Sequence, residues 1–411
     1  MENLTILLAD IILFAAAALI LLPILVFSVE CWASRAPAKR CDRAAKRPRP
    51  PVAILVPAHD EERVIESTIR SLNSELTDQD RLVVVADNCG DDTAAIARSA
   101  GATVLERQDL DHRGKGYALA WGVEHLRDAP PDVLVIIDAD TPADPESIAA
   151  LVGEVQSSNR PAQAAYVLGL PPSPSVRDKV SCFAFTVKSL VRPLGLARLG
   201  LPCSLTGSGI ALPWPLAARA EFGGANIVED LQLGLDLAIS GYPPRFCPSA
   251  RIRGVLPGKK AAAASQRTRW EHGHLQTLLK QTPRLIAEAV KQQRIDLLAM
   301  AMDLAVPPLS LLCLAWATMT GVAALAATLG TSWWPVAILG ASGTALAASV
   351  LLAWSRYGRD VMPLRTLLAV PLYVLWKVPV YLAFVFRRQR DWLRTERGEE
   401  TSSSAGEISR Q

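Results

Sequence analysis

The sequence predicts an α/β domain with a doubly wound, mostly parallel sheet, flanked by transmembrane and interfacial helices. In the middle of the 411-residue chain, short runs that are apolar throughout alternate with runs of helical periodicity. This pattern is typical of parallel strands that helices cover on both faces. At the two ends, apolar residues form segments long enough to cross a hydrocarbon core of ~30 Å. Half of the residues are apolar and the mean hydropathy is positive, which is unusual for a purely water-soluble enzyme.

The first predicted element is an N-terminal transmembrane anchor at residues 1–32. Its apolar run extends from Thr5 to Val29 and is interrupted only by Asp10 and Pro23. Because the run lacks a preceding basic segment and a following small-residue cleavage site, we expect a retained anchor rather than a signal peptide. The linker at 33–50 is rich in Arg and Lys. The positive-inside rule therefore predicts that this linker and the domain behind it are cytoplasmic.

A cytoplasmic α/β domain is predicted at residues 51–258, where strand-like and helix-like runs alternate. The expected strands are Val52–Val56, Leu82–Ala86, Thr103–Leu105 and Val133–Ile137. The helices between them are expected at Glu61–Leu72, Asp92–Ala100 and Tyr117–Leu126. Open sheets of this kind bind their ligands outside the carboxyl ends of the strands. Polar residues at those ends are therefore the first candidates for a functional site.

An acidic pair stands at the end of the fourth predicted strand, in the triplet Asp138-Ala139-Asp140. Residues i and i+2 of a strand share one face, so this spacing points both carboxylates into the crevice. Such a pair can hold Mg²⁺ or Mn²⁺ on a diphosphate, because these cations take oxygen ligands and complete their shell with phosphate and water. Asp87 occupies the corresponding position after the second strand.

Several other polar runs have a structural explanation as well as a functional one. Asp91-Asp92 is a typical N-cap sequence, and Glu229-Asp230 before an apolar run is a typical acidic helix start. Arg113-Gly114-Lys115-Gly116 offers close backbone approach and a point charge for phosphate, but most such runs are solvated turns. Thr206-Gly207-Ser208-Gly209 either brings the backbone close to a sugar or forms a simple turn. None of these runs is decisive alone.

Cysteine, histidine and charge patterns exclude several classes of function. The seven cysteines are scattered and show no C-x-x-C pairing, so we expect neither disulfides nor zinc. His272 and His274 lack the i, i+4 spacing of a helical zinc pair and are expected on a polar helix surface. The net charge of +3 is small, and basic residues lie beside the apolar segments. Anionic lipid explains that placement better than nucleic acid does.

The C-terminal membrane segments are predicted at 301–386, behind a segment at 259–300 that ends in an interfacial helix. The apolar runs are 302–329, 333–354 and 363–386. The positive-inside rule places the uncharged 330–332 link outside and the following Arg-rich loop inside. Pro371, Lys377 and Pro379 interrupt the last run, so either it is re-entrant or interfacial, or the tail at 387–411 lies outside against its charge. We expect the first arrangement, with a cytoplasmic, partly disordered tail.

Five runs follow one another along the chain: Val52 to Glu62, Asp87-Asn88, Asp138-Ala139-Asp140, Glu229-Asp230 and Gln266-x-x-Arg269-Trp270. In this order, they resemble the motifs of membrane-integrated family 2 glycosyltransferases of the inverting, polysaccharide synthase-like type, which have the A-type fold. The resemblance extends from about residue 5 to residue 397. Asp60 stands where the family more often has Asn, and the acidic dyad follows Val228 rather than Thr. Trp392 to Arg397 also resembles the W-x-x-T-x-R gating segment of polysaccharide synthases, although a basic membrane-surface helix explains it equally well.

The resemblance implies a role for each matched residue. The implied donor-binding residues are Pro57, His59, Glu61, Asp87, Lys115, Asp138 and Arg269. The implied acceptor-binding residues are Gly207, Ser208, Gln266 and Trp270. Asp138 and Asp140 would hold Mg²⁺ or Mn²⁺, and Asp230 would be the general base. This division agrees with the chemistry, because the leaving diphosphate is a polyanion and a single positioned base is enough for inversion.

The expected function is therefore metal-dependent transfer of a sugar from a nucleotide-sugar, expected to be a UDP-sugar, to a hydroxyl group. The acceptor is a growing polysaccharide or another saccharide, and the alternative is a ceramide-like or other lipid that receives a single sugar. A non-enzymatic membrane scaffold or transporter is the alternative from another class. That alternative predicts functional polar residues inside the membrane segments, whereas here they gather in the middle of the chain. The expected location is an integral membrane one, the inner membrane if the protein is bacterial.

Overall fold

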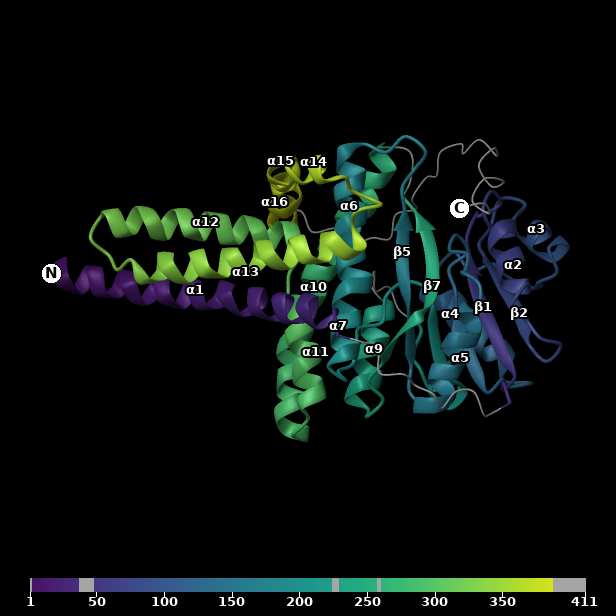
Figure 1. Ribbon diagram of the computed structural model, residues 1–411. Helices are drawn as coiled ribbons and strands as arrows, with labels where there is room; N and C mark the ends of the chain where they lie inside the picture. Colours follow the sequence, from purple (N-terminus) through teal and green to yellow (C-terminus); the bar gives the residue numbers. More distant parts are fainter. Residues whose placement is uncertain (1, 37–47, 224–228, 257–259, 387–411) are drawn as a thin grey trace.

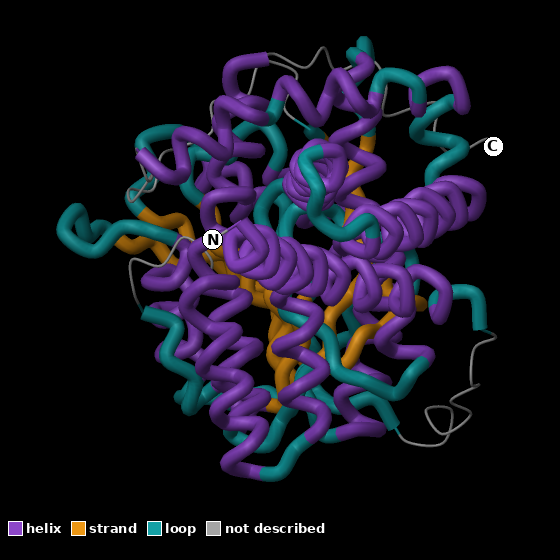
Figure 2. Tube along the Cα trace, turned by 90° about the vertical axis from the view of Figure 1, so that its left-hand side faces the viewer, coloured by secondary structure: helices purple, strands orange, loops and turns teal. Residues whose placement is uncertain are grey.

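The computed structural model describes residues 2–36, 48–223, 229–256 and 260–386. Within these residues, an α/β domain built on a seven-stranded sheet adjoins a bundle of long helices that projects away from it (Figure 1). Seen along the bundle from the N-terminal end, the strands lie behind the helices (Figure 2). Most of the 33–50 linker, the tail at 387–411 and its Trp392–Arg397 run lie outside the described residues.

The sheet confirms the predicted doubly wound, mostly parallel class. Its strands are β1 (Val52–Ala58), β2 (Arg81–Asp87), β3 (Thr103–Arg107), β4 (Val133–Ile136), β5 (Ala162–Gly169), β6 (Ile210–Pro213) and β7 (Arg245–Val255). The strand order is β3-β2-β1-β4-β6-β5-β7. The strand β1 pairs in parallel with β2 and β4, and β5 pairs in parallel with β7. Only β6 runs antiparallel to its neighbours β4 and β5.

Helices cover both faces of the sheet, which explains why the central strands β1 and β4 are apolar throughout. Alternate residues of β1 enter two separate cores: Ile54 packs with α2, α3 and α5, and Leu55 packs with α4. These helices are α2 (Ile65–Asn73), α3 (Thr93–Ser99), α4 (Lys115–Leu126) and α5 (Ser147–Ser158). The helix α2 begins at Ile65 rather than at the predicted Glu61. The backbone N–H groups of Glu61 and Glu62 instead donate to the side chains of Thr93 and Asp91.

In the chain, β5 is followed by a long helical rod, which lies between the sheet and the bundle. It consists of α6 (Val176–Thr186), the π-helical turn η2 (Val187–Val191) and α7 (Arg192–Arg198). The widened turn has a local cause, because Pro193 has no N–H group and its ring would clash with the carbonyl four residues earlier in a regular α-helix. The N–H of Arg192 bonds instead to the carbonyl of Val187, five residues back. Shorter helices follow at α8 (Trp214–Ala217) and α9 (Glu229–Ile239), and the long α10 spans Lys260–Gln292.

The bundle consists of α1 (Glu2–Ala33), α12 (Leu309–Thr328) and α13 (Trp334–Tyr357), joined to the domain by α11 (Ile295–Ala305). Among the described residues, four helical stretches are long and apolar enough to cross a membrane: Leu4–Ala33, Val176–Arg198, Leu309–Thr328 and Trp334–Tyr357. The Val176–Arg198 stretch is the rod, and most of it is buried inside the protein. The other three expose large apolar side chains such as Leu19, which is 74% exposed. Contiguous apolar exposure of this kind suits contact with lipid.

The apolar run at 363–386 is not one straight helix. It forms three short ones, α14 (Leu364–Leu367), α15 (Val370–Trp376) and α16 (Val378–Phe386), at the end of the bundle nearest the sheet (Figure 1). Lys377 lies at the break between the last two helices. Its side chain is 1% exposed and its ammonium forms an ion pair with Glu271 of α10. Lys377 is therefore enclosed within the protein.

The N-terminal helix α1 is fastened to the domain by a buried cluster of charges. The guanidinium of Arg192 lies 2.5 Å from a carboxylate oxygen of Glu30 on α1 and 2.6 Å from one of Asp303 on α11. Close packing accompanies the ion pairs, since a Cβ atom at Gly195 would lie 1.9 Å from the carbonyl oxygen of Glu30. Only glycine permits this approach of α7 to α1.

Candidate functional site

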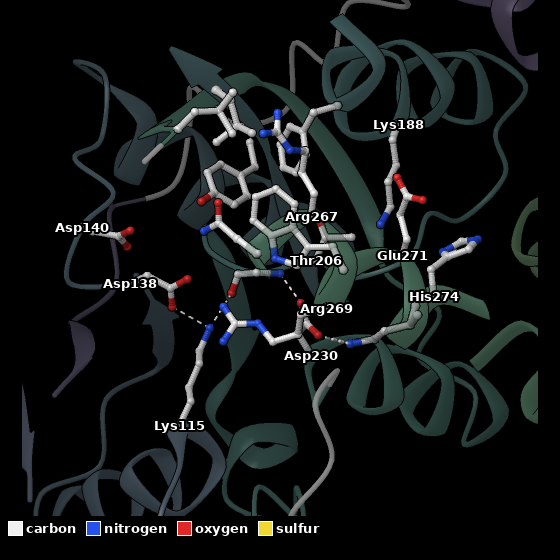
Figure 3. Close-up of a pocket in the computed structure, with 18 of the residues that line it drawn as sticks. Lys115, Asp138, Asp140, Lys188, Thr206, Asp230, Arg267, Arg269, Glu271 and His274 are labelled. Carbon is white, nitrogen blue, oxygen red and sulfur yellow. Dashed lines mark hydrogen bonds and ion pairs between the residues drawn. The ribbon is translucent and has the colours of Figure 1, made fainter. Parts of the chain in front are cut away.

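The candidate site is a cavity of about 1600 Å³ that begins at the carboxyl ends of β1, β2 and β4 and continues toward the helix bundle. Twelve of the predicted site residues line it: Pro57, His59, Glu61, Asp87, Lys115, Asp138, Asp140, Gly207, Asp230, Gln266, Arg269 and Trp270. The fold thus brings together residues that are far apart in the sequence. Figure 3 shows the acidic pair on one side of the cavity, with Asp230 and Arg269 between it and Lys188.

The acidic triplet forms a turn beyond β4 rather than a continuation of the strand. The hydroxyl of Thr141 closes this turn by donating to the carbonyl of Asp138 at 3.0 Å. Ala139 is buried, while the side chains of Asp138 and Asp140 both line the cavity. The predicted alternation of faces therefore holds although the backbone has left the strand.

Ser208 is the predicted site residue that the structure does not bring into the cavity. Its side chain is fully buried, with an exposed fraction of 0%. The Ser208 hydroxyl accepts a hydrogen bond from the backbone N–H of Asp138 at 2.9 Å and also bonds the hydroxyl of Thr141 at 2.6 Å. Ser208 therefore does not line the cavity as predicted for an acceptor-binding residue, because the turn before β6 directs its side chain toward the acidic turn that it positions.

Lys115 connects the acidic turn to Asp230. Its ammonium lies 2.5 Å from Asp138 Oδ1 and donates to the carbonyl of Gly207 at 2.7 Å. The N–H of that same Gly207 donates to the carboxylate of Asp230. Burial alone would lower the pKa of Lys115, but the three nearby carboxylates of Asp138, Glu229 and Asp230 outweigh it and raise the pKa. Lys115 therefore stays charged and bridges the two acidic parts of the site.

Gly207 can only be glycine in this arrangement. Its φ is +57°, and an added Cβ atom would lie 3.0 Å from the ring of Tyr166. The buried side chain of Gln163 holds the same loop from beneath, since it accepts from the N–H of Thr206 at 2.8 Å and donates to the carbonyl of Ser208 at 3.0 Å. Gln163 is a positioning residue that the sequence did not indicate, because a polar residue inside a strand pattern usually reads as a solvent-facing one.

Glu229 and Asp230 begin a helix and also line the cavity. The two residues form the acidic first turn of α9, where carboxylates interact favourably with the helix dipole. They also line the cavity, with a Glu229 oxygen 4.0 Å from the ammonium of Lys115. Burial raises the pKa of Glu229, and the adjacent Asp230 adds to this, although the Lys115 charge opposes it.

The nucleotide end of the predicted site is rigidly built. The carboxylate of Asp87 forms a buried ion pair with Arg107, at 2.6 Å. His59 is held by the carbonyl of Asp87, which lies 2.7 Å from its Nδ1; because a carbonyl only accepts, this nitrogen carries the proton. Arg107 was not indicated by the sequence, since its contribution depends on β3 lying beside β2.

The Q-x-x-R-W pentad lies on α10, where Gln266, Arg269 and Trp270 face the cavity. The ring of Trp270 is 5.3 Å from that of Phe185. The intervening Arg267 has a different environment, because its guanidinium bonds Asp178 at 3.2 Å and the hydroxyl of Ser181 at 3.0 Å. Arg267 thus ties α10 to α6, and it lines the cavity as its neighbours on the helix do.

The expectation of a polar helix surface at His272 and His274 is wrong. His272 is 2% exposed and donates through Nε2 to the carbonyl of Val380 at 2.9 Å. His274 lines the cavity and donates to the carbonyl of Val306 at 3.1 Å. The helices at the end of the bundle cover this part of α10, which α10 alone could not reveal. Burial, aided by the nearby Lys188 charge, lowers the pKa of His274 to about 3.

Because His274 is held neutral, the folded state should become less stable as the pH falls. Its folded pKa is depressed, so its contribution is complete above the unfolded value of ~6.5 and is lost as the pH falls toward 3. Between pH 7.5 and pH 5, we expect the free energy of unfolding of the wild type to fall by about 2 kcal/mol relative to that of His274→Gln. Thermal unfolding of both proteins in detergent across this range measures the difference. A difference that stays constant with pH would show that His274 is not held neutral.

Asp138 and Asp140 fit a divalent cation in their chemistry. Both offer carboxylate oxygens to the same cavity, and oxygen ligands suit Mg²⁺ and Mn²⁺ rather than zinc. Burial raises the pKa of Asp138, and Lys115 opposes this while Asp140 adds to it. Two carboxylates alone leave several coordination positions for phosphate oxygens and water.

Known proteins resemble this chain in sequence and in fold. The family model described as "Glycosyltransferase like family 2" matches residues 48–273. The probable glycosyltransferase YdaM of Bacillus subtilis is 26% identical over 251 residues, which cover 56% of this chain and 57% of that protein. The poly-beta-1,6-N-acetyl-D-glucosamine synthase of Staphylococcus aureus is 22% identical over 243 residues, 56% of each chain. The chain thus spans a little over half the length of these curated relatives.

One solved structure resembles nearly the whole chain. It is the mannosyltransferase PcManGT from Pyrobaculum calidifontis, determined in complex with GDP-Man and Mn²⁺. It is 18% identical, with a TM-score of 0.56, and the similarity covers 92% of this chain and 99% of that one. The likeness shows the fold, including the helices that flank the sheet.

Proposed function

The chain belongs to the glycosyltransferase-like family 2, and from this premise we propose that it transfers a sugar from a UDP-sugar to an acceptor hydroxyl at a membrane, with inversion at the anomeric carbon. The observation that carries the proposal is the connected series Asp138, Lys115, Gly207 and Asp230 within one cavity. It links an acidic turn suited to a diphosphate with a carboxylate suited to deprotonate an alcohol.

The donor occupies the end of the cavity at the strand termini. Pro57, His59 and Glu61 border the base, and Asp87 meets the base or ribose while Arg107 holds its carboxylate in place. Asp138 lies against the ribose and diphosphate, and the cations of Lys115 and Arg269 face the same space. Positive groups that are already positioned stabilise the charge that develops on the leaving diphosphate. When bound, Mg²⁺ or Mn²⁺ held by Asp138 and Asp140 neutralises part of that charge.

The acceptor hydroxyl lies at Asp230. The carboxylate takes the hydroxyl proton as the oxygen attacks the anomeric carbon, and the bond from that carbon to the diphosphate oxygen breaks on the opposite side. Two backbone N–H groups orient the carboxylate, that of Gly207 and that of Leu231 at 2.8 Å. A positioned base of this kind contributes ~10²–10⁴-fold. Trp270 and Gln266 contact the acceptor beside it.

The bundle sets the protein in the membrane, with the α/β domain in the cytoplasm. Asp10 near the start of α1 accepts from the N–H of Ser332 in the turn between α12 and α13, at 2.7 Å, so both lie at the same end of the bundle. The sheet and the three short helices at 364–386 lie at the other end (Figure 1). The positive-inside rule, applied to the basic linker at 33–50, makes the domain end cytoplasmic.

The acceptor is a saccharide, such as a growing polysaccharide, or a lipid that receives one sugar. The similarity to a poly-beta-1,6-N-acetyl-D-glucosamine synthase favours the first. The continuation of the cavity among the membrane helices favours the second.

The test is release of nucleotide diphosphate by the detergent-solubilised protein from a panel of UDP- and GDP-sugars with Mn²⁺. We expect release from one donor, increased by acceptor. If no donor yields release with either added lipid extract or oligosaccharides, and UDP does not bind in the presence of Mn²⁺, the transferase proposal is wrong and the scaffold alternative stands.

Asp140→Ala should weaken UDP binding only when Mn²⁺ is present. Asp140 is proposed to hold the cation and to make no direct contact with the nucleotide. The affinity for UDP without Mn²⁺ should therefore be unchanged. Calorimetric titration of UDP with and without Mn²⁺ separates the two contributions. If the Mn²⁺-dependent affinity matches that of wild type, the acidic turn is not the metal site.

A further inference from the structure

The cavity does not end at Asp230 but continues into the helix bundle, where its lining becomes mostly apolar, with Ser310, Tyr373 and Lys377 as polar members. The apolar residues that line this inner part come from α1, α6, the segment before α12, and the helices α12, α13 and α15. They include Phe27, Phe183, Val306, Leu309, Val350 and Val374. Several of them belong to the same apolar core that joins α1, α6, α12, α13 and α15. The donor end and this inner part form one continuous space.

One cation stands where the two parts of the cavity meet. Lys188 lies on the π-helical turn η2, and its side chain is exposed to the cavity. Figure 3 shows it across the cavity from Lys115, beside Glu271 and His274. π-Helical turns inside α-helices occur frequently at functional sites. Here Pro193 supplies the local cause of the turn.

The charged groups around Lys188 are satisfied by other partners. Glu271 is paired with Lys377, and Arg192 is paired with both Glu30 and Asp303. His274 donates to a backbone carbonyl. Within the described part of the chain, no carboxylate lies within 4.0 Å of the Lys188 ammonium, and it makes no hydrogen bond there. The carboxylates of Asp230, Asp303 and Glu271 act on this charge only from a greater distance. An ammonium without a direct partner beside a largely apolar space favours an anionic ligand.

We propose that the acceptor is a membrane lipid whose headgroup carries both an anionic phosphate and the reacting hydroxyl. Its phosphate binds Lys188, its hydroxyl lies at Asp230, and its apolar chains occupy the inner part of the cavity. This inference rests on the proposed transferase function. The hydroxyl oxygen forms the new bond to the anomeric carbon, its proton passes to Asp230, and the nucleotide diphosphate leaves. A hydrophilic polysaccharide would instead place hydroxyl groups against apolar walls, which desolvates them without compensation.

The test uses the full-length protein in detergent, with Mn²⁺ and the donor identified by the release assay. Three acceptors are compared: phosphatidylglycerol, diacylglycerol and a water-soluble N-acetylglucosamine oligosaccharide. Transfer of radiolabelled sugar to each is measured as kcat and KM, and Mn²⁺-dependent UDP affinity is measured beside it. We expect phosphatidylglycerol to be the best acceptor, with diacylglycerol poorer because it has the hydroxyl but no phosphate.

Two pairs of variants locate the lipid. Lys188→Met should raise the KM for phosphatidylglycerol about 10- to 100-fold, as loss of a charge-assisted hydrogen bond predicts, while Lys188→Arg keeps most of the activity. Cys313→Trp fills the inner cavity from α12 and should block use of the lipid. Ala317→Trp, on an exposed position of the same helix, should not. UDP affinity should be unchanged in all four variants.

The possible results separate the lipid acceptor from the proposed sugar transfer itself. Extension of the oligosaccharide with no transfer to lipid would overturn the lipid acceptor and leave the transferase intact. Equal use of diacylglycerol and phosphatidylglycerol, with no effect of Lys188→Met, would overturn the role of the phosphate. Absence of both UDP binding and diphosphate release would overturn the transferase proposal, and the acceptor inference with it.

Discussion

Asp230→Asn is expected to lower sugar transfer by ~10²–10⁴-fold while Mn²⁺-dependent UDP affinity stays within about twofold of wild type. The amide cannot take the proton of the acceptor hydroxyl. It keeps the shape of the side chain, and its oxygen can still accept from the N–H of Gly207 as the carboxylate does. The loop that joins Asp230 to Lys115 should therefore keep its form, so that the loss reports on proton transfer.

Single-turnover transfer and calorimetric UDP binding measure the two halves of this prediction. Glu229→Gln is the matched control, because Glu229 is the neighbouring carboxylate in the same helical turn and burial raises its pKa. We expect a smaller loss in that variant. A larger loss in Glu229→Gln than in Asp230→Asn would make Glu229 the base.

Lys115→Met should impair both donor binding and transfer, with a loss of about 10- to 100-fold in UDP-sugar affinity. The ammonium contacts Asp138 and the carbonyl of Gly207, and it faces the space proposed for the diphosphate. Without this cation, burial dominates at Asp138, whose pKa is already raised, and the carboxyl takes up a proton more readily. Since only the ionised carboxylate binds a metal well, Mn²⁺-dependent UDP binding by the variant should recover as the pH rises.

The pH dependence distinguishes this explanation from simple loss of a contact. Lys115→Arg keeps the charge, so its UDP binding should not shift toward higher pH even if its affinity falls. If UDP binding by Lys115→Met is weak at every pH, Lys115 acts on the diphosphate directly and not through the ionisation of Asp138. Circular dichroism of each variant checks that the fold is retained.

The sequence predicted the first half of the sheet well because the information there is local. The strands β1, β2 and β4 are mostly apolar runs that end at polar turns, and β3 is a short β-branched and apolar run after a glycine. Helices separate these four strands. The same locality explains why the strand-end residues Asp87, Asp138 and Asp140 could be identified. Parallel strands bring their carboxyl ends to one edge whatever the details of packing.

The residues that were missed depend on contacts between distant parts of the chain. Gln163 holds the loop at Gly207 because β5 lies next to β6, and Arg107 pairs with Asp87 because β3 lies next to β2. Ser208 and His272 were assigned to the wrong environment for the same reason. Lys188 did carry a signal, since a lysine within an apolar helical stretch is a functional candidate by default.

The buried ion pairs of Arg192 with Glu30 and Asp303 limit how such a protein can change during evolution. An anchor that merely tethers a domain can be exchanged for any hydrophobic helix, and fusions or losses of such anchors are easily tolerated. Here α1 supplies a carboxylate to a buried cation, receives α7 across Gly195, and lends Phe27 to the wall of the cavity. Replacement by an unrelated helix would leave the guanidinium of Arg192 with only one carboxylate partner, and it would open the cavity wall. The anchor and the transferase domain are therefore inherited as one unit, and α1 should diverge no faster than the domain that it supports.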